Sequence, residues 1–226
     1  MISYRDLQGL TECQAAYDLQ HAVWGDDDIA DPADLMMVVQ AEGGILAGAF
    51  DGDRLVGYLF GFPTKDPAIQ HSHRLAVLPQ YRGQGLGLAL KLYQMDWCRA
   101  RGIARIRWTF DPLMTRNANL NIHTLGAIGS RYLVNYYGSA GSYQGGVESD
   151  RLVAELYTGA KPAFETVEEL VVPNDFHRLV RQDETAARAA RQSAREMLLS
   201  RFDNGLQIIG YEHTRSAYVF GRPLAG

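Results

Sequence analysis

Two histidines separated by a single residue, His71 and His73, are the side chains in this sequence best suited to proton transfer. The unperturbed pKa of an imidazole is near ~6.5, so its neutral form can accept a proton at cellular pH. Leu75 and Val77 follow at alternate positions, which predicts a β-strand, and continued alternation would place both rings on the face of Leu75 and Val77. The histidines could also be half-buried strand residues with satisfied hydrogen bonds.

A glycine-rich turn follows this strand. Pro79 ends the strand because it cannot donate to a β-ladder, and Gly83, Gly85 and Gly87 lead into the apolar pattern of a helix. Glycine has no Cβ, so the backbone can turn tightly and bring successive N–H groups against a ligand. These N–H groups, with the positive end of the helix behind them, predict a pyrophosphate site.

Two common phosphate-binding motifs do not fit this turn. The Lys-Ser/Thr pair of the Walker-A motif is missing after the glycines, and Arg82-x-x-Gly85-x-Gly87 lacks the spacing of the dinucleotide fingerprint. A turn that only packs a helix on a strand remains the structural alternative.

The longer string Leu-x-Val-x-Pro-x-x-Arg-x-x-Gly-x-Gly, followed by an amphipathic helix, resembles the acyl-CoA-binding motif of the GNAT superfamily of N-acyltransferases. The resemblance covers about residues 1–157 and is sharpest over 73–95. It implies an α/β fold with a mixed, splayed central sheet flanked by helices, and acetyl-CoA or another short acyl-CoA bound where two parallel strands separate. Backbone groups of the first strand would pair with pantetheine, and the turn would hold the pyrophosphate. The residues implied are Leu75, Ala76, Val77, Arg82, Gln84, Gly85, Leu86, Gly87 and Leu88.

The same resemblance implies roles in catalysis. An amine that attacks a thioester directly needs a base, donors for the developing oxyanion and an acid for the departing thiolate. A His-x-His similar to His71 and His73 stands at the same distance before the glycine turn in arylalkylamine N-acetyltransferases, where it relays protons. We therefore expect these histidines to supply the base, with His73 favoured.

The acid is less well indicated. Many members of the superfamily carry a Tyr before the glycine that matches Gly126, where this sequence has Ile122 next to His123. Three other tyrosines are candidates, although strand tyrosines are commonly packing residues. They are Tyr132, which we select, Tyr136 and Tyr137.

The segment from Trp108 to Asn121 resembles the strand and helix of the second half of the CoA site. The resemblance implies that Asn117 bonds the pantetheine arm and that Asn121 belongs to the same cofactor site. Asp111 could orient a histidine or bind an amine, although an Asp before Pro commonly belongs to a turn.

The elements that must position these residues follow an α/β order. A capping box predicts a helix start at Thr11, and Asp31 is the expected N-cap of a second helix that begins with Pro32. The expected strands are 45–50 and 55–62 as a hairpin, 71–77, 103–110, 132–137 and 151–156, with a short helix over 117–125. The glycine-rich segment 138–146 is a candidate lid.

Composition changes near residue 161, so we expect a GNAT domain over residues 1–160 and an extension over 161–226. The extension should contain a polar linker between Pro162 and Pro173, a helix over 183–202 and a closing hairpin over 206–220. The apolar stripe of this helix has to pack on the core or on a second subunit. Arginines on its other faces would form a solvated surface or a site for an acidic acceptor or a CoA phosphate: Arg188, Arg191, Arg195 and Arg201.

Composition also limits the class of protein. The chain has 226 residues, 46% of them hydrophobic, which suffices for a core, and its net charge of −4 argues against nucleic acid as the main partner. Two cysteines without motif spacing indicate neither a metal site nor a disulfide framework, and they fit a reduced, cytoplasmic setting. No apolar run has the length of a membrane span and no signal peptide is evident, so we expect no membrane partner.

These patterns together predict an acyl-CoA-dependent N-acyltransferase that acts on the primary amine of a small molecule, possibly an amino acid, as a monomer or homodimer. The sequence also resembles a little-characterised bacterial branch of the superfamily, some members of which are associated with amino-acid N-acylation. A catalytically silent acyl-CoA sensor and a protein N-acetyltransferase are the alternatives.

Overall fold

Two units make up the computed structural model, Met1–Arg107 and Trp108–Gly226, and residues 1–138 and 146–224 are described. The boundary falls inside strand β5 (Arg105–Phe110). Residues 139–145 of the candidate lid lie outside the described residues. Each unit has its own strands and helices, and the predicted α/β fold with an open, mixed sheet flanked by helices is confirmed.

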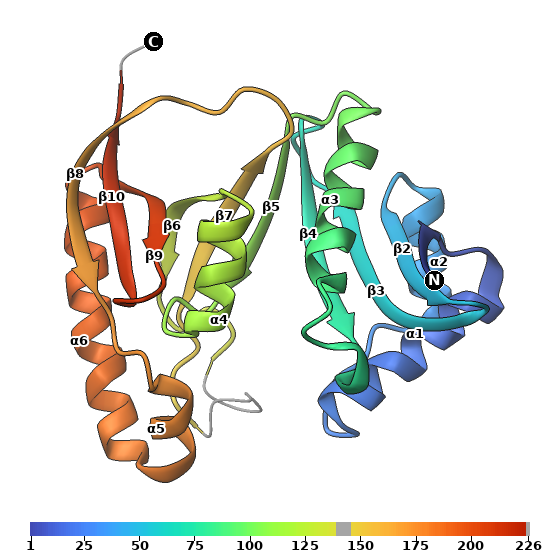
Figure 1. Cartoon of the computed structure of the whole chain (residues 1–226), viewed down its shortest axis with the longest axis horizontal. Coiled ribbons are helices and arrows are strands. Elements are labelled where there is room, and N and C mark those ends of the chain that lie inside the picture. The colour runs from blue at the N-terminus through green and yellow to red at the C-terminus, as the bar shows by residue number, and fades with distance from the viewer. Residues whose placement is uncertain (139–145, 225–226) are drawn as a thin grey trace. The chain divides into compact units, whose positions relative to one another are not determined.

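The first unit is built on a mainly antiparallel sheet with the strand order β1-β2-β3-β4 (Figure 1). Its strands are β1 (Ile2–Asp6), β2 (Ile45–Asp51), β3 (Arg54–Pro63) and β4 (Ile69–Val77), and the start of β5 pairs with β4 in parallel. Its helices are α1 (Gly9–Trp24), α2 (Ala33–Ala41), the short 3-10 helix η1 (Pro79–Tyr81) and α3 (Leu86–Arg99). Strands β2 and β3 are apolar and buried over almost their whole length, as expected where helices cover both faces of a sheet.

The starts of the first two helices differ from the predictions. α1 begins at Gly9 instead of Thr11, and Glu12 accepts the backbone N–H of Gln8 at 2.8 Å, so the predicted capping box is wrong. α2 begins at Ala33 after Pro32, and its N-cap makes no side-chain hydrogen bond. The Asp31 side chain is used elsewhere, in ion pairs with residues of β4.

A β-bulge interrupts β4 at His73. Phe60 of β3 lies opposite Arg74, whereas the next residue, Gly61, lies opposite Ser72, so His73 is an extra residue in β4. A bulge of this kind shifts the alternation of side chains beyond it.

The shift decides which face carries the histidines. Before the bulge, the Ser72 hydroxyl accepts a hydrogen bond from Lys91 of α3, so Ser72 faces α3 and its neighbour His71 faces away. After the bulge, a Cβ on Gly87 of α3 would lie 3.5 Å from Leu75 Cδ2, so Leu75 faces α3. The prediction that the histidines share a face with Leu75 and Val77 is therefore wrong.

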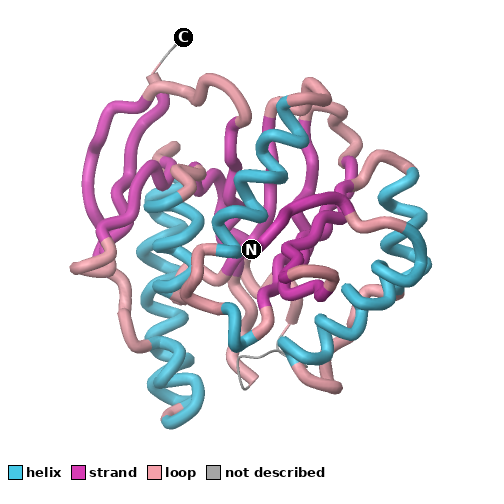
Figure 2. Tube along the Cα trace, turned by 45° about the vertical axis from the view of Figure 1, so that its right-hand side comes forward, coloured by secondary structure: helices cyan, strands magenta, loops and turns pink. Residues whose placement is uncertain are grey.

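The second unit continues from β5 with the strand order β7-β6-β9-β10-β8 (Figure 1). Its strands are β6 (Ile128–Leu133), β7 (Arg151–Tyr157), β8 (Phe164–Val171), β9 (Gln207–Glu212) and β10 (Ala217–Pro223). Its helices are α4 (Thr115–Ala118), which continues as the π-helical turn η2 (Asn119–Thr124), then α5 (Phe176–Gln182) and α6 (Glu184–Asp203), the long helix in Figure 2. The strand expected over 132–137 ends earlier, at Leu133.

The C-terminal segment contains the predicted long helix and hairpin together with two elements that were not expected. Strand β8 occupies the expected linker and pairs with β10, and α5 precedes α6. Within this unit β9 joins β6, with Ile208 opposite Gly129. The domain boundary near residue 160 stays a prediction.

Candidate functional site

The edge of β4 that pairs with β5 is largely open along the C-terminal half of the strand. Its parallel ladder with β5 covers Ile69–His71, whereas its antiparallel ladder with β3 continues to Val77. Among the described residues, the stretch from Ser72 to Val77 therefore has a strand partner on one side only. Backbone N–H and C=O groups on that side can pair with an extended ligand, as the predicted pantetheine contacts of Leu75, Ala76 and Val77 require.

The glycine turn presents N–H groups at the start of α3. Gly85 is the N-cap with a φ of 80°, a left-handed conformation that favours glycine. The first helical hydrogen bond runs from the N–H of Ala89 to the carbonyl of Gly85, so no backbone carbonyl of the described chain accepts the N–H groups of Leu86, Gly87 and Leu88.

The space at the turn also suits a phosphate group. A Cβ built on Gly85 would meet no atom of the described chain within 4 Å. The turn therefore needs glycine for its backbone conformation and leaves the N–H groups accessible at the positive end of a fourteen-residue helix. Arg82 donates from Nε to the carbonyl of Val77 at 3.2 Å, and Gln84 donates to that of Gln80 at 3.4 Å, so both side chains brace the turn.

His71 and His73 lie together on the face of β4 opposite to α3. Their ring centroids are 6.1 Å apart, and each ring contacts a phenylalanine of β3. Phe62 stacks on His71 at 4.9 Å, and Phe60 meets His73 edge-on at 5.8 Å. Both imidazoles therefore lie on one aromatic surface, as residues two positions apart in a strand do, and the bulge separates this surface from the face of Leu75.

The two histidines have different environments. Burial, followed by the nearby His73, Arg107 and Lys91, lowers the pKa of His71 to about 4, so its ring is neutral near pH 7. The His73 side chain is 35% exposed, and its Nε2 lies 3.3 Å from Asp31 Oδ1. His73 therefore has both solvent access and an acidic partner.

Three further charged residues of this unit were not predicted as site residues from the sequence, although Asp31 was expected to be a helix N-cap. Asp31 and Arg74 form an ion pair at 3.1 Å beside His73, and Lys91 of α3 is buried at 4% exposure on the other face of β4. Lys91 donates to Ser72 Oγ at 2.8 Å, and burial lowers its pKa to about 7. The pairing of Asp31 with β4 spans more than forty residues of sequence, so no local pattern signals it, whereas a Lys on the apolar face of a predicted helix is a signal that could have been used.

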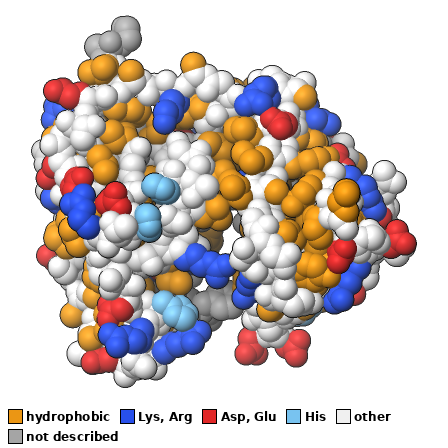
Figure 3. Space-filling model, viewed as in Figure 1, with side chains coloured by type: hydrophobic (Ala, Val, Ile, Leu, Met, Phe, Trp, Pro, Cys, Tyr) orange, Lys and Arg blue, Asp and Glu red, His pale blue; other side chains and the backbone are white. Residues whose placement is uncertain are grey.

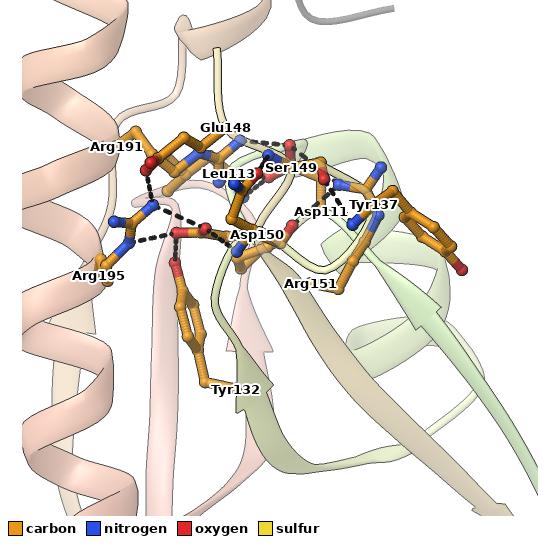
Figure 4. A network of polar contacts seen from close by, with 12 residues as sticks. Asp111, Leu113, Tyr132, Tyr137, Glu148, Ser149, Asp150, Arg151, Arg191 and Arg195 are labelled. Atoms are coloured by element: carbon orange, nitrogen blue, oxygen red, sulfur yellow. Dashed lines mark hydrogen bonds and ion pairs between the residues drawn. The ribbon is translucent and has the colours of Figure 1, made fainter. Parts of the chain in front are cut away.

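In the second unit, Tyr132 is buried and its hydroxyl donates to Asp150 Oδ2 at 2.5 Å (Figure 4). Burial, together with this hydrogen bond, raises the pKa of Tyr132. Asp150 also accepts from Arg195 of α6 and from the backbone of Asn135. Tyr132 would have to leave this carboxylate to act as an acid, and its catalytic role stays a prediction.

The other two candidate tyrosines are exposed: Tyr136 by 54% and Tyr137 by 58%. The Tyr137 hydroxyl lies 3.3 Å from Thr109 Oγ1, and its ring lies 5.2 Å from the Arg151 guanidinium.

Asp111 is the partner of a buried arginine of α6. Its carboxylate accepts from Arg191 at 2.9 and 2.5 Å, and both side chains are less than 5% exposed (Figure 4). Asp111 also accepts the N–H of Leu113, which is the turn contact that its position before Pro112 suggested. Neither a histidine nor an open amine site is needed to explain this carboxylate.

The helix arginines are largely occupied by carboxylates of the same unit. Arg191 pairs with Asp111, Arg195 with Glu148 and Asp150, and Arg201 with Glu168. Arg191 lies inside the buried stripe of α6, which the sequence had assigned to apolar residues only. An acceptor or CoA phosphate would therefore have to compete with existing ion pairs.

The two predicted asparagines lie on consecutive turns of the second unit. Asn117 is exposed in α4, whereas Asn121 is buried in η2 at 6% exposure and its carbonyl accepts the N–H of Ala127. Gly126 has a φ of 68° and ends this helical segment, as predicted. The cofactor roles of both asparagines stay predictions.

The model of the acetyltransferase (GNAT) family matches residues 10–124. This range covers just over half of the chain and contains the glycine turn. The chain belongs to this family. The resemblance noted in the sequence is thereby confirmed at the level of the superfamily. Among the curated proteins, none matches the chain.

Solved GNAT structures share the fold. The ribosomal-protein-S18-alanine N-acetyltransferase of Escherichia coli is 19% identical, with 71% of this chain and 96% of that chain covered and a TM-score of 0.59. An aminoglycoside 6'-N-acetyltransferase from Enterococcus faecium is 18% identical, with coverages of 72% and 99% and a TM-score of 0.56. A GNAT family acetyltransferase from Elizabethkingia anophelis with acetyl-CoA bound is 16% identical, with coverages of 69% and 97% and a TM-score of 0.56.

Surface charge and hydropathy add two findings. On the face drawn in Figure 3, basic and acidic side chains are interspersed in each unit, in keeping with the net charge of −4. Within residues 1–138 and 146–224, no helix combines the length and the apolar character that a membrane span requires.

Proposed function

We propose that this GNAT protein is an acyl-CoA-dependent N-acyltransferase that transfers an acetyl or another short acyl group to the primary amine of a small molecule, amino acids included. The observation that carries this proposal is the combination within one unit of an open β4 edge, a glycine turn with accessible N–H groups and a histidine pair on the same strand. We further propose a cytoplasmic protein, monomeric or homodimeric, that needs no metal.

The cofactor contacts follow from the backbone. The open edge of β4 at Leu75, Ala76 and Val77 would pair with the pantetheine arm, and the N–H groups from Gln84 to Leu88 would bind the pyrophosphate. Asn117 and Asn121 complete the proposed contacts in the second unit. When bound, acyl-CoA supplies an acyl group that is activated as a thioester.

The proton chemistry is assigned to the histidines. His73 accepts the proton of the acceptor ammonium, because its ring is partly exposed and faces a carboxylate. His71 has a pKa of about 4, so its ring remains neutral. We therefore assign it to acceptor binding or proton relay and not to the role of main base. Tyr132 is the proposed acid for the leaving thiolate.

A thiol-release assay tests the proposal. The full-length protein is given acetyl-CoA or succinyl-CoA with a panel of amines, free amino acids and peptides, and CoA binding is measured separately by calorimetry. Release of CoA with formation of an N-acyl amine is expected for one class of small acceptor. CoA binding without release against any acceptor would instead support a silent sensor, and turnover with peptides alone would support a protein N-acetyltransferase.

A further inference from the structure

A carboxylate from a distant part of the chain stands against His73. Asp31 lies in the connection between α1 and α2, and its Oδ1 is 3.3 Å from His73 Nε2. The Asp31 side chain is 17% exposed and the His73 side chain 35% exposed. The carboxylate is thus largely shielded from water, whereas the ring keeps an open side.

Asp31 is held in place from two directions. Arg74 Nε lies 3.1 Å from Asp31 Oδ2, and Arg74 is itself anchored by Asp28 at 2.5 Å and by the carbonyl of Ile29 at 2.7 Å. The backbone N–H of Asp31 donates to the buried Gln20 side chain at 2.8 Å, and the Gln20 amide donates back to the Asp31 carbonyl at 3.2 Å. Both the main chain and the carboxylate of Asp31 are therefore fixed before any ligand binds.

We infer that Asp31 is a positioning residue for His73, an inference that rests on the proposed function. With the carboxylate at Nε2, the neutral ring carries its proton on Nε2 and leaves the lone pair on Nδ1. Nδ1 then takes the proton from the acceptor ammonium, and the resulting imidazolium keeps Asp31 as its counter-ion.

The charged groups around His73 carry a net negative charge. Asp28 and Asp31 carry two negative charges against the single positive charge of Arg74, which leaves one negative charge beside the ring. Two aromatic rings of β3 limit the access of water on one side. The titratable and charged groups that face His73 or this cluster are His71, Arg74, Tyr58, Asp28 and Asp31.

Steady-state kinetics with the full-length protein test the inference. Asp31→Asn should lower kcat at least tenfold, move the acidic limb of the pH–rate profile to lower pH and leave the KM for acyl-CoA within about twofold. Asp28→Asn is the matched control, because it removes the same charge and also pairs with Arg74. It should cause a smaller loss of kcat and a smaller shift of the acidic limb, because Asp28 does not contact the ring. Equal effects of the two variants would overturn the specific role of Asp31.

Ring NMR gives a readout that does not depend on turnover. In the free parent protein at pH 8, His73 should carry its proton on Nε2, and Asp31→Ala should give a mixture of tautomers. A parent ring protonated on Nδ1 would overturn the inference. If His73→Ala keeps the parental kcat, the proposed base fails. If His73→Ala is impaired but Asp31→Asn keeps the parental pH profile, the base stands and the role of Asp31 fails.

Discussion

His71 and His73 occupy neighbouring positions on one aromatic surface, but the chemistry assigned to them is unequal. Because a general base contributes about 10²–10⁴-fold, replacing both residues with Ala should lower kcat by that order. Because the proposed cofactor contacts are made by backbone groups, CoA affinity should change by less than about threefold. Turnover and calorimetry of the double variant check both numbers.

Single variants divide the roles of the two histidines. His73→Ala should account for most of the loss and flatten the acidic limb of the pH–rate profile, whereas His71→Ala should leave the position of that limb unchanged because the His71 pKa of about 4 lies below it. A double variant that works at the parental rate from pH 6 to 9 would make both histidines packing residues. A rise confined to KM would assign them to acceptor binding.

The burial of Lys91 makes the stability of the folded protein depend on pH. The pKa of Lys91 is about 7 in the folded protein, below its ordinary value of 10.5. Between these two pH values, the unfolded chain binds a proton at Lys91 that the folded protein does not bind. Stability is therefore lost as the pH falls through this window. Lys91→Met should raise the free energy of unfolding at pH 6 by an amount of the order of a few kcal/mol, and by much less at pH 10.5.

Chemical denaturation of the parent and the variant at both pH values measures this difference. The exposed Lys65 offers a matched control, since Lys65→Met removes the same charge without relieving burial and should give no pH-dependent gain. Ser72→Ala in the Lys91→Met background corrects for the hydroxyl that loses its donor. A gain that is equal at the two pH values would contradict the assigned cause.

Residue types and their spacing were enough to find the histidine pair, but not to orient it. An alternating pattern counts one residue per pleat, and the bulge adds a residue that no local pattern marks. Asp31 was assigned to a helix cap for a similar reason, since Asp before Pro has a strong local preference. Its actual partners lie on β4, and only tertiary packing brings them together.

At the scale of elements, the start of α3 permits a paired test of cofactor binding. Gly83 and Gly85 have φ values of 78° and 80°, and a Cβ on either would meet nothing within 4 Å. Ala at either position should therefore cost a similar ~1–2 kcal/mol of backbone strain. Only Gly85 lies within the N–H groups proposed to bind pyrophosphate, so Gly85→Ala should weaken CoA binding at least tenfold and Gly83→Ala much less.

Calorimetry with CoA on the two folded variants decides the matter, and thermal unfolding verifies that their stabilities match. If both variants bind CoA like the parent, the turn only packs a helix on a strand. If both lose affinity equally, general strain in the loop is the cause.

The elements with strong periodicity were the ones predicted well. The hairpin of β2 and β3, the helix after the glycine turn and the long helix α6 have sustained patterns and clear turn signals. Strand β1 and strand β8 were not expected, because β1 has five residues and β8 carries exposed glutamates and valines at a sheet edge. Their pairing with β2 and β10 is long-range in sequence, so it stabilises strands that have weak local signals.

At the scale of the whole molecule, a buried ion pair fastens the C-terminal helix of the second unit. Arg191 sits among the small residues of the α6 stripe and is 1% exposed. Arg191→Met should lower the free energy of unfolding by about 3–5 kcal/mol, because it leaves the Asp111 carboxylate buried without this partner. Thermal and urea unfolding of the purified variant measure the loss.

The double variant Arg191→Met with Asp111→Asn should recover a large part of that stability, since the side chain that lost its bidentate partner is then neutral. Arg178→Met is the control for the loss of charge alone, because Arg178 is 66% exposed and its ion pair with Asp175 joins residues three positions apart. A double variant no more stable than Arg191→Met would mean that packing of the guanidinium matters and not its charge.

The extra residue at His73 has a consequence for inheritance. Deleting one codon at this point would remove the bulge and leave the sequence from Leu75 through the glycine turn intact. Without the extra residue, Ser72 would still lie opposite Gly61 and Arg74 opposite Phe60, so Ser72 and Leu75 would both keep facing α3 and only the His73 imidazole would be lost. The bulge is therefore an insertion that a one-codon deletion can reverse without moving the neighbouring side chains to the other face of the sheet. Relatives that are one residue shorter at this point should keep the same side chains on each face of the sheet and lack the imidazole that His73 provides here.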